Sequence, residues 1–148
     1  MKLSDFKYNE NLAETGIWVT IDEGAKIKIS KLNHPKYRAL VNQLRKPYRS
    51  YEVAKRELPD EVVRNITVEA CAREILRDWS GITDDNGKDI PFTLEGAKEA
   101  LRIDAFLSMV LGFASDDNLF RETTVEEDSK NLPKSLPLEP SKDADQEG

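Results

Sequence analysis

Hydrophobic and polar positions alternate along two short runs near the N-terminus, which is the pattern of β-strands. The runs cover Ile17–Asp22 and Lys26–Leu32, and the turn Glu23-Gly24-Ala25 separates them. We therefore predict a β-hairpin with Ile27 and Ile29 on its inner face. Because two strands alone are only marginally stable, the hairpin must pack on helices or pair its edge with another chain. The second option predicts a self-association site formed by Ile17, Val19, Ile27 and Ile29.

Beyond the hairpin, apolar residues recur three and four positions apart, which predicts helices. Asn33 or His34 is suited to cap the first of them, Pro35 to its first turn, and Gly81 to stop the longest one. The dipeptide Asn86-Gly87 favours a type I′ turn and so a second small hairpin over residues 82–91. The expected helices run from Pro35 to Pro47, Tyr48 to Glu57, Pro59 to Trp79, Thr93 to Leu101 and Ile103 to Phe113.

The length and the apolar pattern bound the architecture. A chain of 148 residues fits one domain with a real core. We predict an α+β, predominantly α-helical fold, in which the N-terminal hairpin packs on a bundle of four to five helices. A flexible arm over residues 1–14 precedes a single domain over 15–122, and a disordered acidic tail covers 123–148. The expected core residues are Ile17, Val19, Ile27, Ile29, Leu40, Leu44, Ile66, Ile75, Leu76, Trp79, Leu101, Phe106, Leu107, Val110 and Phe113.

The charge is distributed unevenly. Residues 115–148 hold ten acids and four bases, which accounts for the whole net charge of −6. The segment Lys26–Arg56 holds ten bases and one acid, Glu52. No apolar run approaches the ~18–20 residues that span a bilayer, and no hydrophobic stretch follows Met1–Phe6 as in a secretory signal, so we expect no membrane association. The single cysteine, Cys71, excludes an internal disulfide.

Residue types that carry catalysis are scarce. His34 is the only histidine, and its place before Pro35 is more typical of a helix cap than of a catalyst. Cys71 lies within a predicted helix and has no second Cys or His to activate it. The glycines are isolated, so no phosphate-binding loop is expected. We therefore predict no enzymatic activity, no catalytic residues and no cofactor.

The acidic run Asp84–Asp89 resembles a calcium-binding loop at first sight. An EF-hand needs an oxygen ligand at its fifth position, and counting from Asp84 that position is Lys88. We therefore predict a plain turn and no metal site.

The basic segment is the strongest candidate for recognition, because tyrosines lie among its bases. Such a mixture is typical of nucleic-acid surfaces, but it also fits a protein partner or plain solvation, and a net charge of −6 opposes attraction to phosphate. We favour a protein partner and treat a small nucleic-acid-binding regulator as the alternative. The candidate partner-binding residues are Lys36, Arg38, Arg45, Tyr48, Arg49 and Tyr51.

One stretch carries a family resemblance. The block from Cys71 to Ile82, with the pair Asp78-Trp79, is followed by Asp85-Asn86-Gly87-Lys88 and Pro91-Phe92. Together with the run Asn118–Arg121, this order resembles the tail assembly chaperones of long-tailed (siphovirus-type) bacteriophages, and the resemblance covers roughly residues 15–131.

The resemblance implies a protein without catalytic activity that acts in the cytoplasm of the host bacterium during virion assembly. It implies two partners, the tape-measure protein and the tail tube protein, and it implies homo-oligomers. Such chaperones keep the tape-measure protein soluble, promote tube polymerisation around it and are absent from the finished virion. Members are often made in two lengths by ribosomal frameshifting, and Ser129-Lys130-Asn131 fits a slippery codon run. On that hypothesis, residues 132–148 are read only in the unshifted product.

Overall fold

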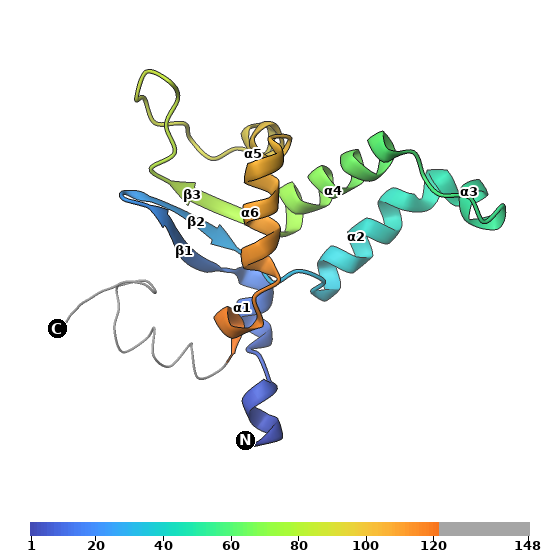
Figure 1. Cartoon of the computed structure of the whole chain (residues 1–148), viewed down its shortest axis with the longest axis horizontal. Coiled ribbons are helices and arrows are strands. Elements are labelled where there is room, and N and C mark those ends of the chain that lie inside the picture. Colours follow the sequence, from blue (N-terminus) through green and yellow to red (C-terminus); the bar gives the residue numbers. More distant parts are fainter. Residues whose placement is uncertain (122–148) are drawn as a thin grey trace.

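A computed structural model of the chain describes residues 1–121. It has a three-stranded antiparallel sheet with helices before, between and after its strands, so the predicted α+β, mostly helical class is confirmed (Figure 1). The sheet contains β1 (Ile17–Asp22), β2 (Ala25–Ile29) and β3 (Leu76–Ser80). The helices are α1 (Glu10–Thr15), α2 (Pro35–Arg45), α3 (Arg49–Val53), α4 (Asp60–Glu74), α5 (Leu94–Leu101) and α6 (Asp104–Ala114). Short 3-10 turns are η1 (Leu3–Phe6), η2 (Lys46–Tyr48) and η3 (Asp117–Phe120).

The predicted N-terminal hairpin is present as β1 and β2. Val19 lies opposite Ile27, and both side chains are buried, because period-two alternation places them on one face. Gly24 turns the chain between the strands with a positive φ of 79°.

The long helix predicted from Pro59 to Trp79 is wrong in its last turn. α4 ends at Glu74, and residues 76–80 form β3, in which Trp79 lies opposite Ile27 of β2. The outer edge of β2 offers unpaired backbone groups, and pairing them outweighs the local helical pattern. A register shift between Lys28 and Ile29 keeps Leu76 and Trp79 both buried, so their three-residue spacing imitates a helix.

Gly81, predicted as the stop of that helix, has a different role. It follows β3 with a positive φ of 79°, and a Cβ atom there would lie 1.8 Å from the carbonyl oxygen of Gly24. The glycine therefore lets the end of β3 pass the β1–β2 turn at close range.

The third strand also corrects the predicted self-association site. Val19, Ile27 and Ile29 are buried in the core, and Ile17 is half-buried against it. Both edges of β2 are occupied within the chain, because β2 lies between β1 and β3. The three buried side chains therefore offer no surface to a second copy, because the hairpin packs on the helices and pairs with its third strand within its own molecule.

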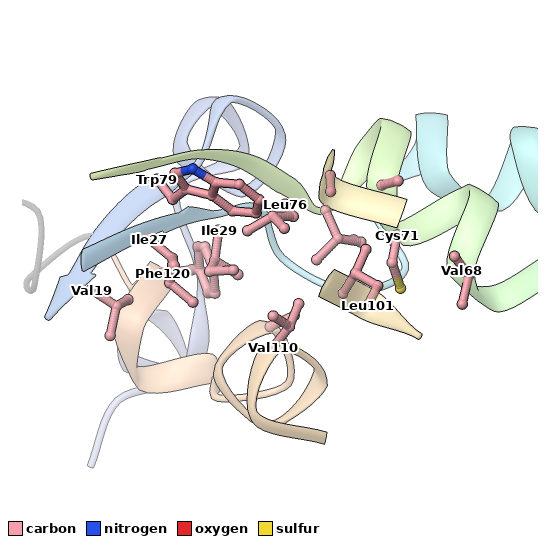
Figure 2. Packing of buried hydrophobic residues seen from close by; sticks show 14 residues of the cluster. Val19, Ile27, Ile29, Val68, Cys71, Leu76, Trp79, Leu101, Val110 and Phe120 are labelled. Atoms are coloured by element: carbon pink, nitrogen blue, oxygen red, sulfur yellow. The ribbon is translucent and has the colours of Figure 1, made fainter. Parts of the chain in front are cut away.

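The core lies between the sheet and the helices α4, α5 and α6 (Figure 2). Most of the predicted core is confirmed, while Ile17, Phe106, Leu107 and Phe113 are only partly buried against it. Leu40 and Leu44 are half-buried and lie outside this cluster. Phe120, which the prediction omitted, is 0% exposed. Buried residues labelled in the close-up are Val19, Ile27, Ile29, Val68, Cys71, Leu76, Trp79, Leu101, Val110 and Phe120.

The second hairpin over residues 82–91 is present in reduced form, with a bridge between Thr83 and Asp89. The predicted type I′ turn is wrong: within the turn only Gly87 has a positive φ. The amide of Gly87 donates to the Asp84 carbonyl and the amide of Asp84 to the Lys88 carbonyl, as in a type I turn followed by a glycine bulge. The Asp84 carboxylate accepts the amides of Asn86 and Lys88, which is a turn contact.

Helices α2 and α4, with η2 and α3 between them, form a two-helix unit that extends away from the sheet (Figure 1). We call residues 35–74 the helical hairpin. α2 has no fully buried side chain, because α4 covers only one side of it.

The N-terminal segment contacts the last described residues of the chain. Residues 3–6 and 10–15 are helical, and the amide of Asn9 donates to the carbonyl of Phe120. The predicted disordered tail and the proposed frameshift position lie outside the described residues. Within residues 1–121, no helix combines the length and the apolar character needed to cross a bilayer.

Candidate partner-binding surface

All six predicted partner-binding residues lie on the α2–η2–α3 part of the helical hairpin, but the structure divides them into two groups. Lys36 and Arg38 lie at the base of the hairpin, near the sheet. The Lys36 ammonium contacts the Glu14 carboxylate at 2.7 Å, and this contact lowers the pKa of Glu14 and raises that of Lys36. Arg38 donates to the carbonyl of Asn33. Both of these basic side chains, Lys36 and Arg38, therefore already have partners within the molecule.

His34 fixes the base of the hairpin. It is 3% exposed, and its Nδ1 accepts the Tyr37 amide at 3.4 Å, which makes it the cap of α2 as the sequence predicted. Its Nε2 lies 2.7 Å from the carbonyl oxygen of Glu74, at the last turn of α4. With Nδ1 as acceptor, Nε2 carries the proton and donates to that carbonyl. One imidazole therefore joins the start of α2 to the end of α4.

Arg77 joins the same region to the sheet. Its Nε donates to Ser30 Oγ at 2.7 Å, and its Nη2 donates to the carbonyl of Glu14 at 2.8 Å and to the Glu74 carboxylate at 3.2 Å. Ser30 is fully buried, so these bonds satisfy groups that water cannot reach. The contacts join α1, α4 and the segment after β2, and they leave this guanidinium little capacity for a ligand.

Cys71 and Tyr37 contact each other between α4 and α2. Burial raises the pKa of the Cys71 thiol to about 12, and burial together with Cys71 raises that of Tyr37 to about 12. The thiolate is the nucleophilic form of cysteine, so at neutral pH this thiol is unreactive. Cys71 is a packing residue, as predicted.

The other four predicted residues meet at the far end of the hairpin. We call residues 45–56 the basic tip. The rings of Tyr48 and Tyr51 are 6.4 Å apart, and the Arg56 guanidinium lies 5.3 Å from the Tyr51 ring centroid. Arg45 contacts the Glu52 carboxylate at 3.8 Å, and Arg49 is exposed. The tip therefore groups cations around two half-buried aromatic rings.

A comparison with protein-family models finds one family that fits this chain. The model described as the YdaY prophage protein matches residues 32–131. The chain belongs to the YdaY prophage protein family. Neither the curated proteins nor the solved structures contain a significant match. The protein is therefore phage-derived, in agreement with the coarser part of the predicted resemblance.

The YdaY match begins at Leu32, two residues before the cap His34, so it contains the whole helical hairpin. It also contains β3, α5 and α6, whereas β1 and β2 lie before it. The hairpin thus belongs to the part of the chain that defines the family.

The hairpin also carries apolar surface. Leu40, Val41 and Leu44 of α2 are half-buried, and Val53 of α3 and Val63 of α4 are 80% and 44% exposed. In a helix packed on both sides, such residues are buried. The two-helix hairpin therefore offers apolar side chains next to the basic tip, the mixture that protein interfaces use.

A shallow pocket at the base of the hairpin has a volume of about 360 Å³. Its charged lining includes Lys28, Lys36 and Arg77, which face the carboxylates of Glu14 and Asp78. These opposite charges largely compensate one another, and Arg77 is already bonded. Within the part of the chain that the structure describes, no cluster of three or more His, Cys, Asp or Glu is placed to hold a metal ion.

Proposed function

We propose that this prophage protein is a tail assembly chaperone without enzymatic activity, acting in the host cytoplasm. It binds the tape-measure protein, keeps it soluble, promotes polymerisation of the tail tube protein around it and is absent from the finished virion. Membership of a prophage family supports a role in phage biology. The sequence resemblance between residues 15 and 131 supports the specific role.

The observation that carries this proposal is the half-exposed helical hairpin. A tape-measure protein is long and largely helical, so its apolar stripes are exposed to water until the tube covers them. A two-helix unit whose apolar side chains are only partly buried is suited to pack against such a stripe. Val53 and Val63 are the most exposed of these apolar residues within residues 35–74.

The alternative, a small nucleic-acid-binding regulator, is favoured by the grouping of Lys46, Arg49, Tyr48 and Tyr51 at the basic tip. Two features count against it. Both tyrosine rings are half-buried, which reduces the ring surface on which bases can stack. Arg45 pairs with Glu52, which reduces its attraction to phosphate. A shift assay with DNA and RNA separates the two functions, since a regulator requires binding that falls steeply with salt.

Self-association is part of the proposal, now placed on another surface. Among the described residues β1 is an edge strand of the sheet, and the outer edge of such a strand can pair with a second copy. This edge replaces the buried side chains that the sequence suggested.

Co-expression with the tape-measure protein of the same prophage tests the function. We expect the tape-measure protein to be soluble with the wild-type chain and to aggregate without it. Val53→Asp should weaken the complex about fivefold or more, because a charge in an apolar contact costs at least ~1 kcal/mol. The measurement is the soluble fraction of the tape-measure protein and its co-purification.

Leu3→Asp is the matched control, because Leu3 is 87% exposed but lies outside the hairpin. It should behave like the wild type. If the tape-measure protein stays insoluble whichever variant is present, the proposed function is wrong.

A further inference from the structure

The basic tip holds cations that have no partner in the described part of the chain. The side chains of Lys46, Arg49 and Lys55 are exposed and make no hydrogen bond or ion pair with residues 1–121. At the base of the hairpin, by contrast, Lys36 and Arg38 are both engaged. Over residues 45–56 there are five bases against one acid. The tip therefore carries an uncompensated positive charge.

The tip also presents apolar surface between these charges. Val53 is 80% exposed, the Tyr48 and Tyr51 rings form a tilted pair, and the Arg56 guanidinium lies over the Tyr51 ring. A segment that binds here should combine carboxylates with aliphatic side chains, because either kind alone would leave half of the surface unmatched.

The chain itself contains a segment of this composition. Its last ten residues hold four acids and one base, and three leucines precede them. The acids are Glu139, Asp143, Asp145 and Glu147, and the leucines are Leu132, Leu136 and Leu138.

The point where the described chain ends makes contact within one molecule feasible. Arg121 pairs with Tyr8, next to α1, and α1 contacts the start of α2 through Glu14 and Lys36. The 18 residues from Arg121 to Glu139 can span about 60 Å when extended, against a length of about 16 Å for α2. A tether of this kind gives an effective concentration in the millimolar range.

We propose that the acidic end of the chain, residues 139–148, binds the basic tip of the same molecule. Its carboxylates pair with Lys46, Arg49 and Lys55, and the preceding leucines contact the tyrosine rings and Val53. A partner that uses the tip must displace this segment first. The proposal does not depend on the chaperone function, because it concerns two parts of one chain.

The amide chemical shifts of residues 45–56 in the full-length protein test the proposal. Neutralising the distal acids with E139Q/D143N/D145N should move these amide signals, and high salt should move the wild-type signals in the same direction. The matched control E126Q/E127Q/D128N also removes three acids, but these lie only five to seven residues beyond Arg121. It should leave the tip signals in place.

A dilution series then identifies the molecule that supplies the segment. The wild-type tip signals should not change with protein concentration if the contact is intramolecular. The proposal is overturned if E139Q/D143N/D145N leaves the tip signals unmoved, or if E126Q/E127Q/D128N moves them equally. It is also overturned if dilution of the wild type reproduces the change, because the segment would then come from a second copy.

Discussion

Trp79→Ala is expected to lower the free energy of unfolding by about 3–5 kcal/mol, which is a large part of a small domain's stability. Trp79 is 7% exposed although it lies in an edge strand. Its ring meets Phe92 edge-on at 5.0 Å and Phe106 at 6.5 Å, and its Nε1 donates to the Ile90 carbonyl at 2.7 Å. The substitution removes the contact between the sheet, α6 and the loop that precedes α5.

Chemical denaturation measures this effect, and two further variants separate its parts. Trp79→Phe keeps an aromatic ring but loses the indole donor, so we expect a smaller loss of about 1–3 kcal/mol from the unpaired Ile90 carbonyl and the lost ring area. Trp18→Ala is the control, since Trp18 is 38% exposed; it should cost about 1 kcal/mol or less. A Trp79→Ala protein with wild-type stability but no partner binding would make Trp79 an interface residue.

Phe120→Ala is expected to have an effect of similar size, about 3–5 kcal/mol. Phe120 is the largest of the fully buried side chains in residues 1–121 and is 0% exposed. Its carbonyl accepts the Asn9 amide at 2.6 Å, so η3 also holds the segment before α1. Losing the ring should therefore leave a cavity and loosen the N-terminal helix as well.

Denaturation curves and amide exchange in α1 measure the two consequences. Phe6→Ala serves as the control, because Phe6 is 56% exposed and its removal should change stability by about 1 kcal/mol or less. A loss below about 1 kcal/mol for Phe120→Ala would mean that η3 is not part of the core.

Local patterns were sufficient for most of the elements. The alternation in residues 17–32 predicted β1 and β2, and the helix starts predicted at Pro35 and Thr93 are confirmed by α2 and α5. Thr93, for example, accepts the Gly96 amide at 2.9 Å, as expected of a cap. These elements depend on residues close in sequence, so a local sequence pattern is enough to predict them.

Long-range features were not predictable in the same way. β3 exists because residues 76–80 pair with β2, whose residues lie 47 to 54 positions earlier in the chain. The helical spacing of Ile75, Leu76 and Trp79 concealed this strand. The predicted core omitted Phe120, because only the tertiary fold brings this residue into the core cluster.

The candidate site shows the same division. The bases and tyrosines of the tip were visible in the sequence as a basic segment. Their separation from Lys36 and Arg38 depends on the length of α2 and on the partner Glu14, which lies in another helix. The hydrogen bond between His34 and the Glu74 carbonyl joins residues 40 positions apart, so no local pattern predicts it. The role of His34 as a helix cap was predictable, because the residue stands directly before Pro35.

Amide hydrogen exchange of the complex with the tape-measure protein tests whether the helical hairpin is the binding surface. We expect binding to slow exchange at amides of the helical hairpin, chiefly in α3 and the adjoining ends of α2 and α4, while the sheet amides keep their free-state rates. Slowed exchange confined to β1 or α6, with the hairpin unchanged, would contradict the assignment of the hairpin as the chaperone surface.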